Sequence, residues 1–146
     1  MKRFGYLVAV LLLVFPASVN AADMTIQMLN KDIGSKERNM YSPALIQIEL
    51  GDTVKWVAID RGHNVEFVRG AFPEGVKPFR SALGKDVSYT FSTPGAYVFK
   101  CAPHYGLGMV GIIIVGETPD NLSEIAAKKY PGKADKRIDA LLAPLT

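Results

Sequence analysis

The sequence predicts an all-β fold, a β-sandwich that is followed by two short C-terminal α-helices. Two observations carry this prediction. Between Met24 and Val115, short runs alternate between apolar and polar side chains, the period-two pattern of strands, and turn residues separate these runs. After Gly116 the composition changes, and apolar residues recur at helical spacing up to Pro144.

Residues 1–21 have the pattern of a secretory signal peptide. Two basic residues precede an apolar stretch, residues 6–15, and small residues follow up to Ala22. This apolar stretch is about ten residues long, whereas a membrane-spanning helix needs about twenty, so we expect no membrane insertion. We place the cleavage after Ala21, with a cut one residue later as the alternative. Residues 22–146 then form a single exported domain.

The first half of this domain is expected to contain three strands, at residues 25–29, 44–50 and 53–59. In the third of them, Val54 and Trp56 share one face while Lys55 lies on the other, as in a half-buried strand. We expect the large apolar side chains of this part and of the next to lie in the core, namely Trp56, Phe67 and Phe99 with the methionines Met24, Met28 and Met40.

The second half is expected to contain three more strands, at residues 86–91, 96–101 and 109–115. Alternation places Tyr97, Phe99 and Cys101 on one face, which turns the thiol inward. The last run is almost continuously apolar, as expected of a strand that is buried on both faces.

A helical extension is expected over residues 118–143. Thr118 can cap a helix that begins at Pro119 and ends near Tyr130, and a second helix covers residues 134–142. Helices this short are marginal in water by themselves, so both must pack against the sandwich.

Charge and cysteine content exclude several classes of function. The chain has 17 basic and 14 acidic residues, and removal of the signal peptide takes away Lys2 and Arg3. The small remaining excess argues against nucleic-acid binding. Cys101 is the only cysteine, so no internal disulfide can form. An exported lone thiol needs protection, either by burial or by a bound metal.

Both histidines and the only cysteine lie in two short segments. His63 stands in Gly62-His63-Asn64, and the segment 101–109 contains Cys101, His104 and Met109. Because Cys101 ends one strand and Met109 opens the next, one loop can present a thiolate, an imidazole and a thioether to a single point. His63 must join them from another loop at the same end of the sandwich.

Two imidazoles and a thiolate, with a weak axial thioether, form the type 1 blue-copper site of electron-transfer proteins. We therefore predict one type 1 copper per chain, with the ligands His63, Cys101, His104 and Met109. Asn64 is expected to hydrogen-bond between the two ligand loops. No separate acid, base or nucleophile cluster is evident, which predicts a protein that is not an enzyme.

These segments resemble the cupredoxin family and, within it, the pseudoazurins, which are periplasmic blue-copper proteins of bacteria. The resemblance rests on residues 62–66, on the turn at residues 93–97, and on residues 100–105 together with Met109. It extends over the mature chain and includes the two C-terminal helices. The segment from Asp32 to Tyr41 is longer than the family pattern and departs from it most.

The resemblance implies an eight-stranded Greek-key β-sandwich whose copper cycles between Cu(II) and Cu(I). It further implies a periplasmic electron carrier whose partner is a copper nitrite reductase or another periplasmic reductase of denitrification, with a cytochrome c as a further candidate partner. We expect a monomer.

The partner is expected to dock where a ligand comes nearest to solvent. This ligand should be His104, surrounded by the apolar surface of Ala102, Pro103, Tyr105 and Leu107. Basic residues near the ligand loops could form a ring that steers an acidic partner, namely Arg61, Arg69, Lys77, Arg80 and Lys100.

Two other functions stay open at this point. A copper-delivery protein would have exposed methionine- or histidine-rich ligands and exchange its metal readily. A zinc-stabilised interaction domain would have closed tetrahedral coordination, usually richer in cysteine. Adding Cu(II) to the metal-free protein separates them, because only the carrier should turn intensely blue.

Overall fold

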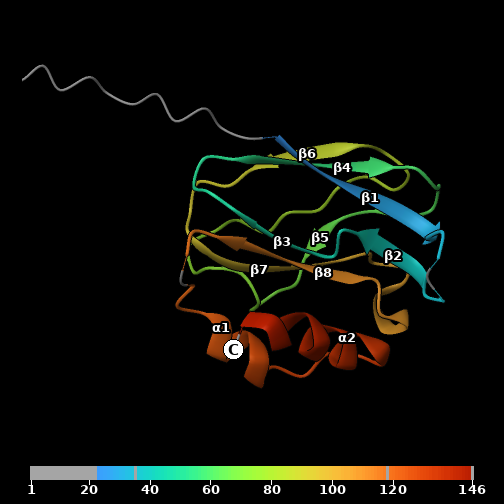
Figure 1. Ribbon diagram of the computed structural model, residues 1–146. Helices are drawn as coiled ribbons and strands as arrows, with labels where there is room; N and C mark the ends of the chain where they lie inside the picture. Colours follow the sequence, from blue (N-terminus) through green and yellow to red (C-terminus); the bar gives the residue numbers. More distant parts are fainter. Residues whose placement is uncertain (1–22, 35, 118, 146) are drawn as a thin grey trace, which may run out of the picture.

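A computed structural model describes residues 23–34, 36–117 and 119–145. The predicted signal peptide and the predicted cap Thr118 lie outside these described residues. Within them, eight strands form two four-stranded sheets that pack face to face, with two α-helices on one side (Figure 1). The prediction of an all-β sandwich with two C-terminal helices is confirmed.

The first sheet has the strand order β2-β1-β4-β6. Its strands are β1 (Asp23–Lys31), β2 (Arg38–Ser42), β4 (Thr53–Ala58) and β6 (Val87–Thr90). β1 pairs parallel to β4 and antiparallel to β2. The second sheet has the order β3-β8-β7-β5. Its strands are β3 (Leu45–Ile48), β5 (Glu66–Phe67), β7 (Gly95–Lys100) and β8 (Val110–Val115).

The core between the sheets follows from strand alternation. On β7, Tyr97 and Phe99 point into it, together with Cys101 just beyond the strand. Ala96 and Val98 point to the opposite face of the same strand, where they meet the helices. β8 is likewise buried on both faces, as its nearly continuous apolar sequence predicts.

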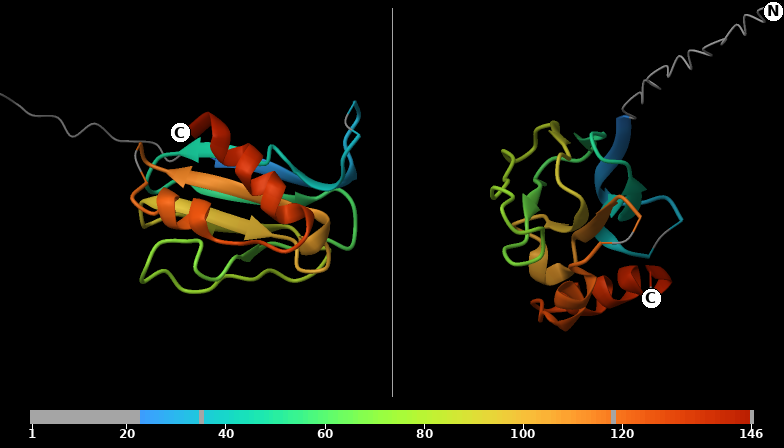
Figure 2. Two further views of the ribbon diagram at one scale, coloured as in Figure 1. Left: turned by 90° about the horizontal axis from the view of Figure 1, so that it is seen from below. Right: turned by 90° about the vertical axis from the view of Figure 1, so that its left-hand side faces the viewer.

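The helices α1 (Leu122–Ala127) and α2 (Lys133–Leu142) cover the outer face of the second sheet (Figure 2). Ile125 of α1 and Ile138 of α2 are fully buried against this face, in a second apolar cluster. In the described part of the chain, no helix is both long and apolar enough to cross a membrane.

The structure corrects the predicted bounds of the first helix. The helix begins at Leu122 and not at Pro119, because Asn121 is tied to strand β7: its Oδ1 accepts a hydrogen bond from the Ala96 N–H and its Nδ2 donates to the Ala96 carbonyl, both at 2.9 Å. It ends before Tyr130 because the backbone of Lys128 is extended.

Met24 is not a core residue, contrary to the prediction. It shares a face of β1 with the buried Ile26 and Met28, yet its side chain is 36% exposed. The alternation is correct, but Met24 is only the second residue of β1, at the end of the strand. Met40 is half-buried, whereas Trp56, Phe67 and Phe99 lie in the core as predicted.

Candidate metal centre

The four predicted ligands come from two loops at one end of the sandwich. His63 lies in the connection from β4 to β5, and Cys101 directly follows β7. The 3-10 helix η1 (Tyr105–Leu107) then carries the chain to Met109, which precedes β8. The antiparallel pairing of β7 with β8 brings the two ends of this loop together, because Lys100 lies opposite Val110.

Three donor atoms converge on a single point. The Sγ of Cys101 lies 3.7 Å from the Nδ1 of His63 and 3.4 Å from the Nδ1 of His104, and the two Nδ1 atoms are 3.2 Å apart. A point equidistant from all three atoms is about 2.0 Å from each, close to the lengths of metal bonds to imidazole and thiolate in zinc sites, about 2.0–2.3 Å. The three donor atoms can therefore all bind one metal ion that forms bonds of this length.

Met109 is held beside these donors by its backbone. Its N–H donates to the His104 carbonyl at 3.2 Å, and its carbonyl accepts from the Cys101 N–H at 3.0 Å. His63, Cys101 and Met109 are all 0% exposed, whereas His104 is only partly buried. His104 thus lies nearest to solvent, as the sequence predicts.

Asn30, at the end of β1, sets the orientation of the His63 ring. Its Oδ1 lies 2.9 Å from the Nε2 of His63, and the Asn30 N–H donates to the Oδ2 of Asp60 at 2.7 Å. A carboxamide oxygen only accepts, so Nε2 carries the proton and the lone pair of Nδ1 faces the cluster. This contact could not be predicted from the sequence, because the two residues are 33 positions apart.

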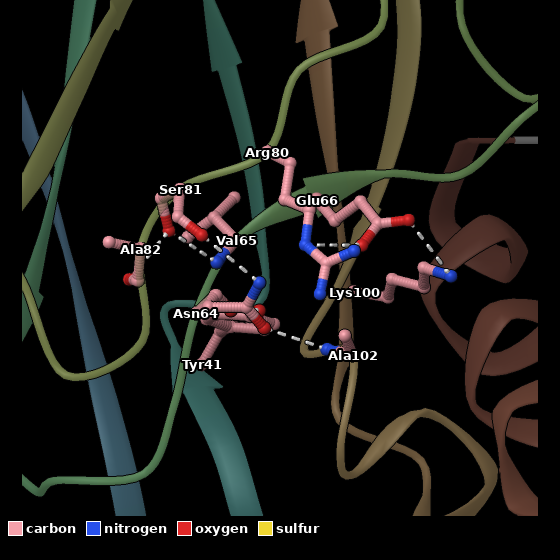
Figure 3. A network of polar contacts seen from close by, with 9 residues as sticks. All are labelled: Tyr41, Asn64, Val65, Glu66, Arg80, Ser81, Ala82, Lys100 and Ala102. Carbon is pink, nitrogen blue, oxygen red and sulfur yellow. Dashed lines mark hydrogen bonds and ion pairs between the residues drawn. The ribbon is translucent and has the colours of Figure 1, made fainter.

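Asn64 joins the two ligand loops, which confirms the prediction made for it (Figure 3). Its Oδ1 accepts a hydrogen bond from the Ala102 N–H at 2.8 Å, and its Nδ2 donates to the Ser81 carbonyl at 3.4 Å. The Asn64 carbonyl in turn accepts from the Tyr41 hydroxyl at 2.6 Å. The side chain is only 2% exposed.

Burial also sets the protonation of the donors. It lowers the pKa of His63, and the neighbouring His104 lowers it further, so this imidazole stays neutral and able to bind a metal. Burial raises the pKa of the Cys101 thiol, which the backbone amides of Asn64 and His104 partly offset. A bound metal would therefore have to stabilise the thiolate form of Cys101.

Two of the five predicted ring cations are already paired. Glu66 lies 3.5 Å from the Nε of Arg80 and 3.3 Å from the Nζ of Lys100 (Figure 3). The Lys100 ammonium also lies 4.6 Å from the centroid of the Tyr105 ring, a cation–π contact. Lys100 is thereby folded against the loop and projects little charge toward solvent.

Comparison with known proteins agrees with this geometry. Residues 28–116 match the family model of copper binding proteins of the plastocyanin/azurin family. A pseudoazurin from Paracoccus pantotrophus is 41% identical over 135 residues, which cover 92% of this chain and 92% of that protein.

Solved structures show the same likeness. The crystal structure of native pseudoazurin from Hyphomicrobium denitrificans is 42% identical, with a TM-score of 0.81, and the match covers 86% of this chain and 99% of that one. The pseudoazurin structure from Methylobacterium extorquens AM1 is 34% identical, with a TM-score of 0.80, over 86% of this chain and all of that one. The chain therefore belongs to the plastocyanin/azurin family of copper-binding proteins and, within it, to the pseudoazurins, which are electron carriers and not enzymes.

Proposed function

We propose that this pseudoazurin is a periplasmic carrier that holds one type 1 copper and delivers single electrons to a periplasmic reductase such as a copper nitrite reductase. Its copper ligands are His63, Cys101, His104 and Met109. The observation that carries the proposal is the convergence of one thiol sulfur and two imidazole nitrogens within bonding reach of a single ion.

When bound, copper supplies the one-electron change between Cu(II) and Cu(I). The residues supply a site that suits both charge states, because imidazole binds either and the soft sulfur donors favour Cu(I). Asn30 and Asn64 hold the donors through hydrogen bonds, and backbone bonds fix the loop from Cys101 to Met109. Such a site rearranges little when its charge changes, which favours fast electron transfer.

The electron enters and leaves through the edge of His104, the least buried of the four ligands. Pro103 and Leu107 flank it with exposed apolar surface, and Leu107 is 54% exposed. A partner that covers this surface comes close to the ligand ring and excludes water. Interfaces of this kind are small, below about 1,200 Å² in total, and release the partner quickly.

Copper delivery is the weaker candidate. A delivery protein passes its metal to another protein by ligand exchange, so the incoming ligands must reach the ion. Here three of the four ligand side chains are fully buried, and His104 is partly covered. Ready exchange would require the ligand loops to open.

The test is spectroscopic. Metal-free mature protein to which Cu(II) is added should develop the intense visible absorption of a copper–thiolate bond, and the matched variant Cys101→Ser should remain folded and lack this absorption. A colourless wild-type product would contradict the copper site. The delivery of electrons is tested by mixing the reduced holoprotein with a purified copper nitrite reductase and following the return of the blue colour; no return would contradict this partner.

Export is tested separately. Expression of the full chain in a Gram-negative host should yield a periplasmic product whose mass corresponds to a start at Ala22. Retention of the uncleaved chain in the cytoplasm would contradict the assignment.

A further inference from the structure

A groove of about 920 Å³ lies between the connection from β1 to β2 and the helix α2. The connection from β1 to β2 and the start of α2 lie at the end of the molecule that carries the β7–β8 loop, residues 101–109 (Figure 2). Leu107 and Gly108 of the β7–β8 loop line the groove, so the groove lies next to the metal centre. None of the four predicted ligands lines it. Apart from Leu107, none of its lining residues takes part in the function proposed above.

The charge of the groove is strongly one-sided. Its lining includes five cations and one carboxylate: Lys36, Arg38, Lys133, Lys136, Arg137 and Glu37. Arg137 forms an ion pair with Glu37, which ties the loop to α2 across the groove. The other four cations are exposed, and no ion pair with a carboxylate is recorded for them among the described residues. Because the whole chain has an excess of only three cations, this concentration is local.

The lining of the groove is partly apolar. Leu107, Ala140 and Leu141 contribute to it beside the charged residues. An inorganic anion would pair with the cations and leave this apolar surface in contact with water. A peptide that carries carboxylates at intervals could pair with the cations and also cover the apolar surface, and the volume of the groove suits several residues.

The wall of the groove that α2 forms packs against the β7–β8 loop. A Cβ at Gly132, just before α2, would overlap the carbonyl oxygen of Gly106, and a Cβ at Gly108 would lie 3.3 Å from the Cβ of Lys133. The start of α2 therefore packs directly on the loop that carries His104 and Met109. The opposite wall comes from residues 36–39.

We propose that this groove binds an acidic segment of the electron-transfer partner and so forms a second docking site beside the exposed edge of His104. The inference rests on the proposed electron-transfer function. A partner that lays a run of Asp and Glu residues in the groove contacts Leu107 and is thereby guided onto the apolar surface around His104. Contacts between exposed charges raise the rate of association and help to orient the partner. They remain weak enough for the partner to dissociate.

The experiment titrates hexaglutamate into the copper(I) form of the mature holoprotein at low salt and follows backbone amide chemical shifts. We expect shifts at Lys36, Arg38, Lys133 and Lys136 that saturate, and binding that weakens as salt rises to about 0.2 M, where the screening length falls below about 8 Å. The double variant K36E/K136E should bind hexaglutamate about tenfold more weakly.

The matched control is K85E/K129E, which changes the net charge equally with exposed side chains outside the groove. Near wild-type affinity of this control supports the groove. Equal weakening of both double variants, or shifts scattered over the surface, would overturn the inference by showing general attraction only. The visible spectrum of each protein is recorded separately in its Cu(II) form, so a failed copper site is distinguished from a failed groove.

Discussion

Replacement of Asn64 by alanine should weaken both the fold and the copper site. The side chain is buried, accepts one hydrogen bond of 2.8 Å from the Ala102 N–H and donates a longer one of 3.4 Å to the Ser81 carbonyl. The variant leaves both backbone groups without this partner. A buried donor left unsatisfied costs about 1–3 kcal/mol, and the longer bond adds less. We therefore expect the free energy of unfolding to fall by about 2 kcal/mol.

Asn121 provides a matched control at a distance from the metal. Its carboxamide also bridges two backbone groups, the N–H and the carbonyl of Ala96, with both hydrogen bonds at 2.9 Å. Asn121→Ala should therefore destabilise the metal-free protein by a similar amount, about 2 kcal/mol. Only Asn64→Ala loosens the link between the ligand loops, so only it should lower copper affinity, by about tenfold to a hundredfold.

The assay combines urea unfolding of both metal-free variants with competition for copper against a chelator of known affinity. Similar unfolding free energies with copper affinity reduced only in Asn64→Ala would support the reasoning. If the two variants lose copper affinity equally, Asn64 acts through general stability, and the role assigned to its link between the loops is refuted.

Three further predictions concern other parts of the scaffold. Asn30→Ala removes the acceptor for the Nε2–H of His63, so copper affinity should fall by about tenfold while the visible band persists, and an unchanged affinity in the same competition assay would contradict this role. Burial raises the pKa of Tyr97 from 10.0 to about 12, so its neutral ring stabilises the fold fully below pH 10 and this contribution is lost as pH rises toward 12. Tyr97→Phe should therefore make the fall in unfolding free energy over this range shallower, by at most about 1.4 kcal/mol per pH unit, and urea titrations with the same slope in both proteins would count against it. Gly132→Ala adds a methyl group that overlaps the β7–β8 loop and should lower the free energy of unfolding, followed by thermal unfolding, by about 2–3 kcal/mol. The control Gly75→Ala also has a positive φ but places its methyl group in open space, so it should lose less stability. Equal losses of stability in the two variants would exclude the overlap as the cause.

The sequence predicts those strands that carry a clear alternation. Six of the eight strands were expected, most of them because inward residues, such as Tyr97 and Phe99 on β7, recur with period two, and β8 because its sequence is almost continuously apolar. β5 has only two residues and is too short to show any period. β2 is an edge strand of mainly polar composition, and only its pairing with β1 identifies it. Pairing with a distant partner is invisible to a local pattern.

The same distinction applies to the metal centre. Three ligands could be predicted together because one loop contains them, and the fourth because the chain has only one other histidine. Asn30 could not be predicted, since nothing near it in sequence marks it as a partner of His63. The groove could not be predicted either, because Glu37 and Arg137, which form an ion pair across it, are 100 positions apart.

The C-terminal helix α2 also supports the copper site, because it packs against the loop that carries three of the predicted ligands. The β7–β8 loop is bound on its inner side by Asn64 through Ala102, and on its outer side it meets the start of α2 through Gly106 and Gly108. A loop held from both sides has few conformations, so its donors keep their positions when the charge of the metal changes. The extension beyond residue 118 thus does more than cover a sheet: it limits the movement of His104, the ligand through which we expect the electron to pass.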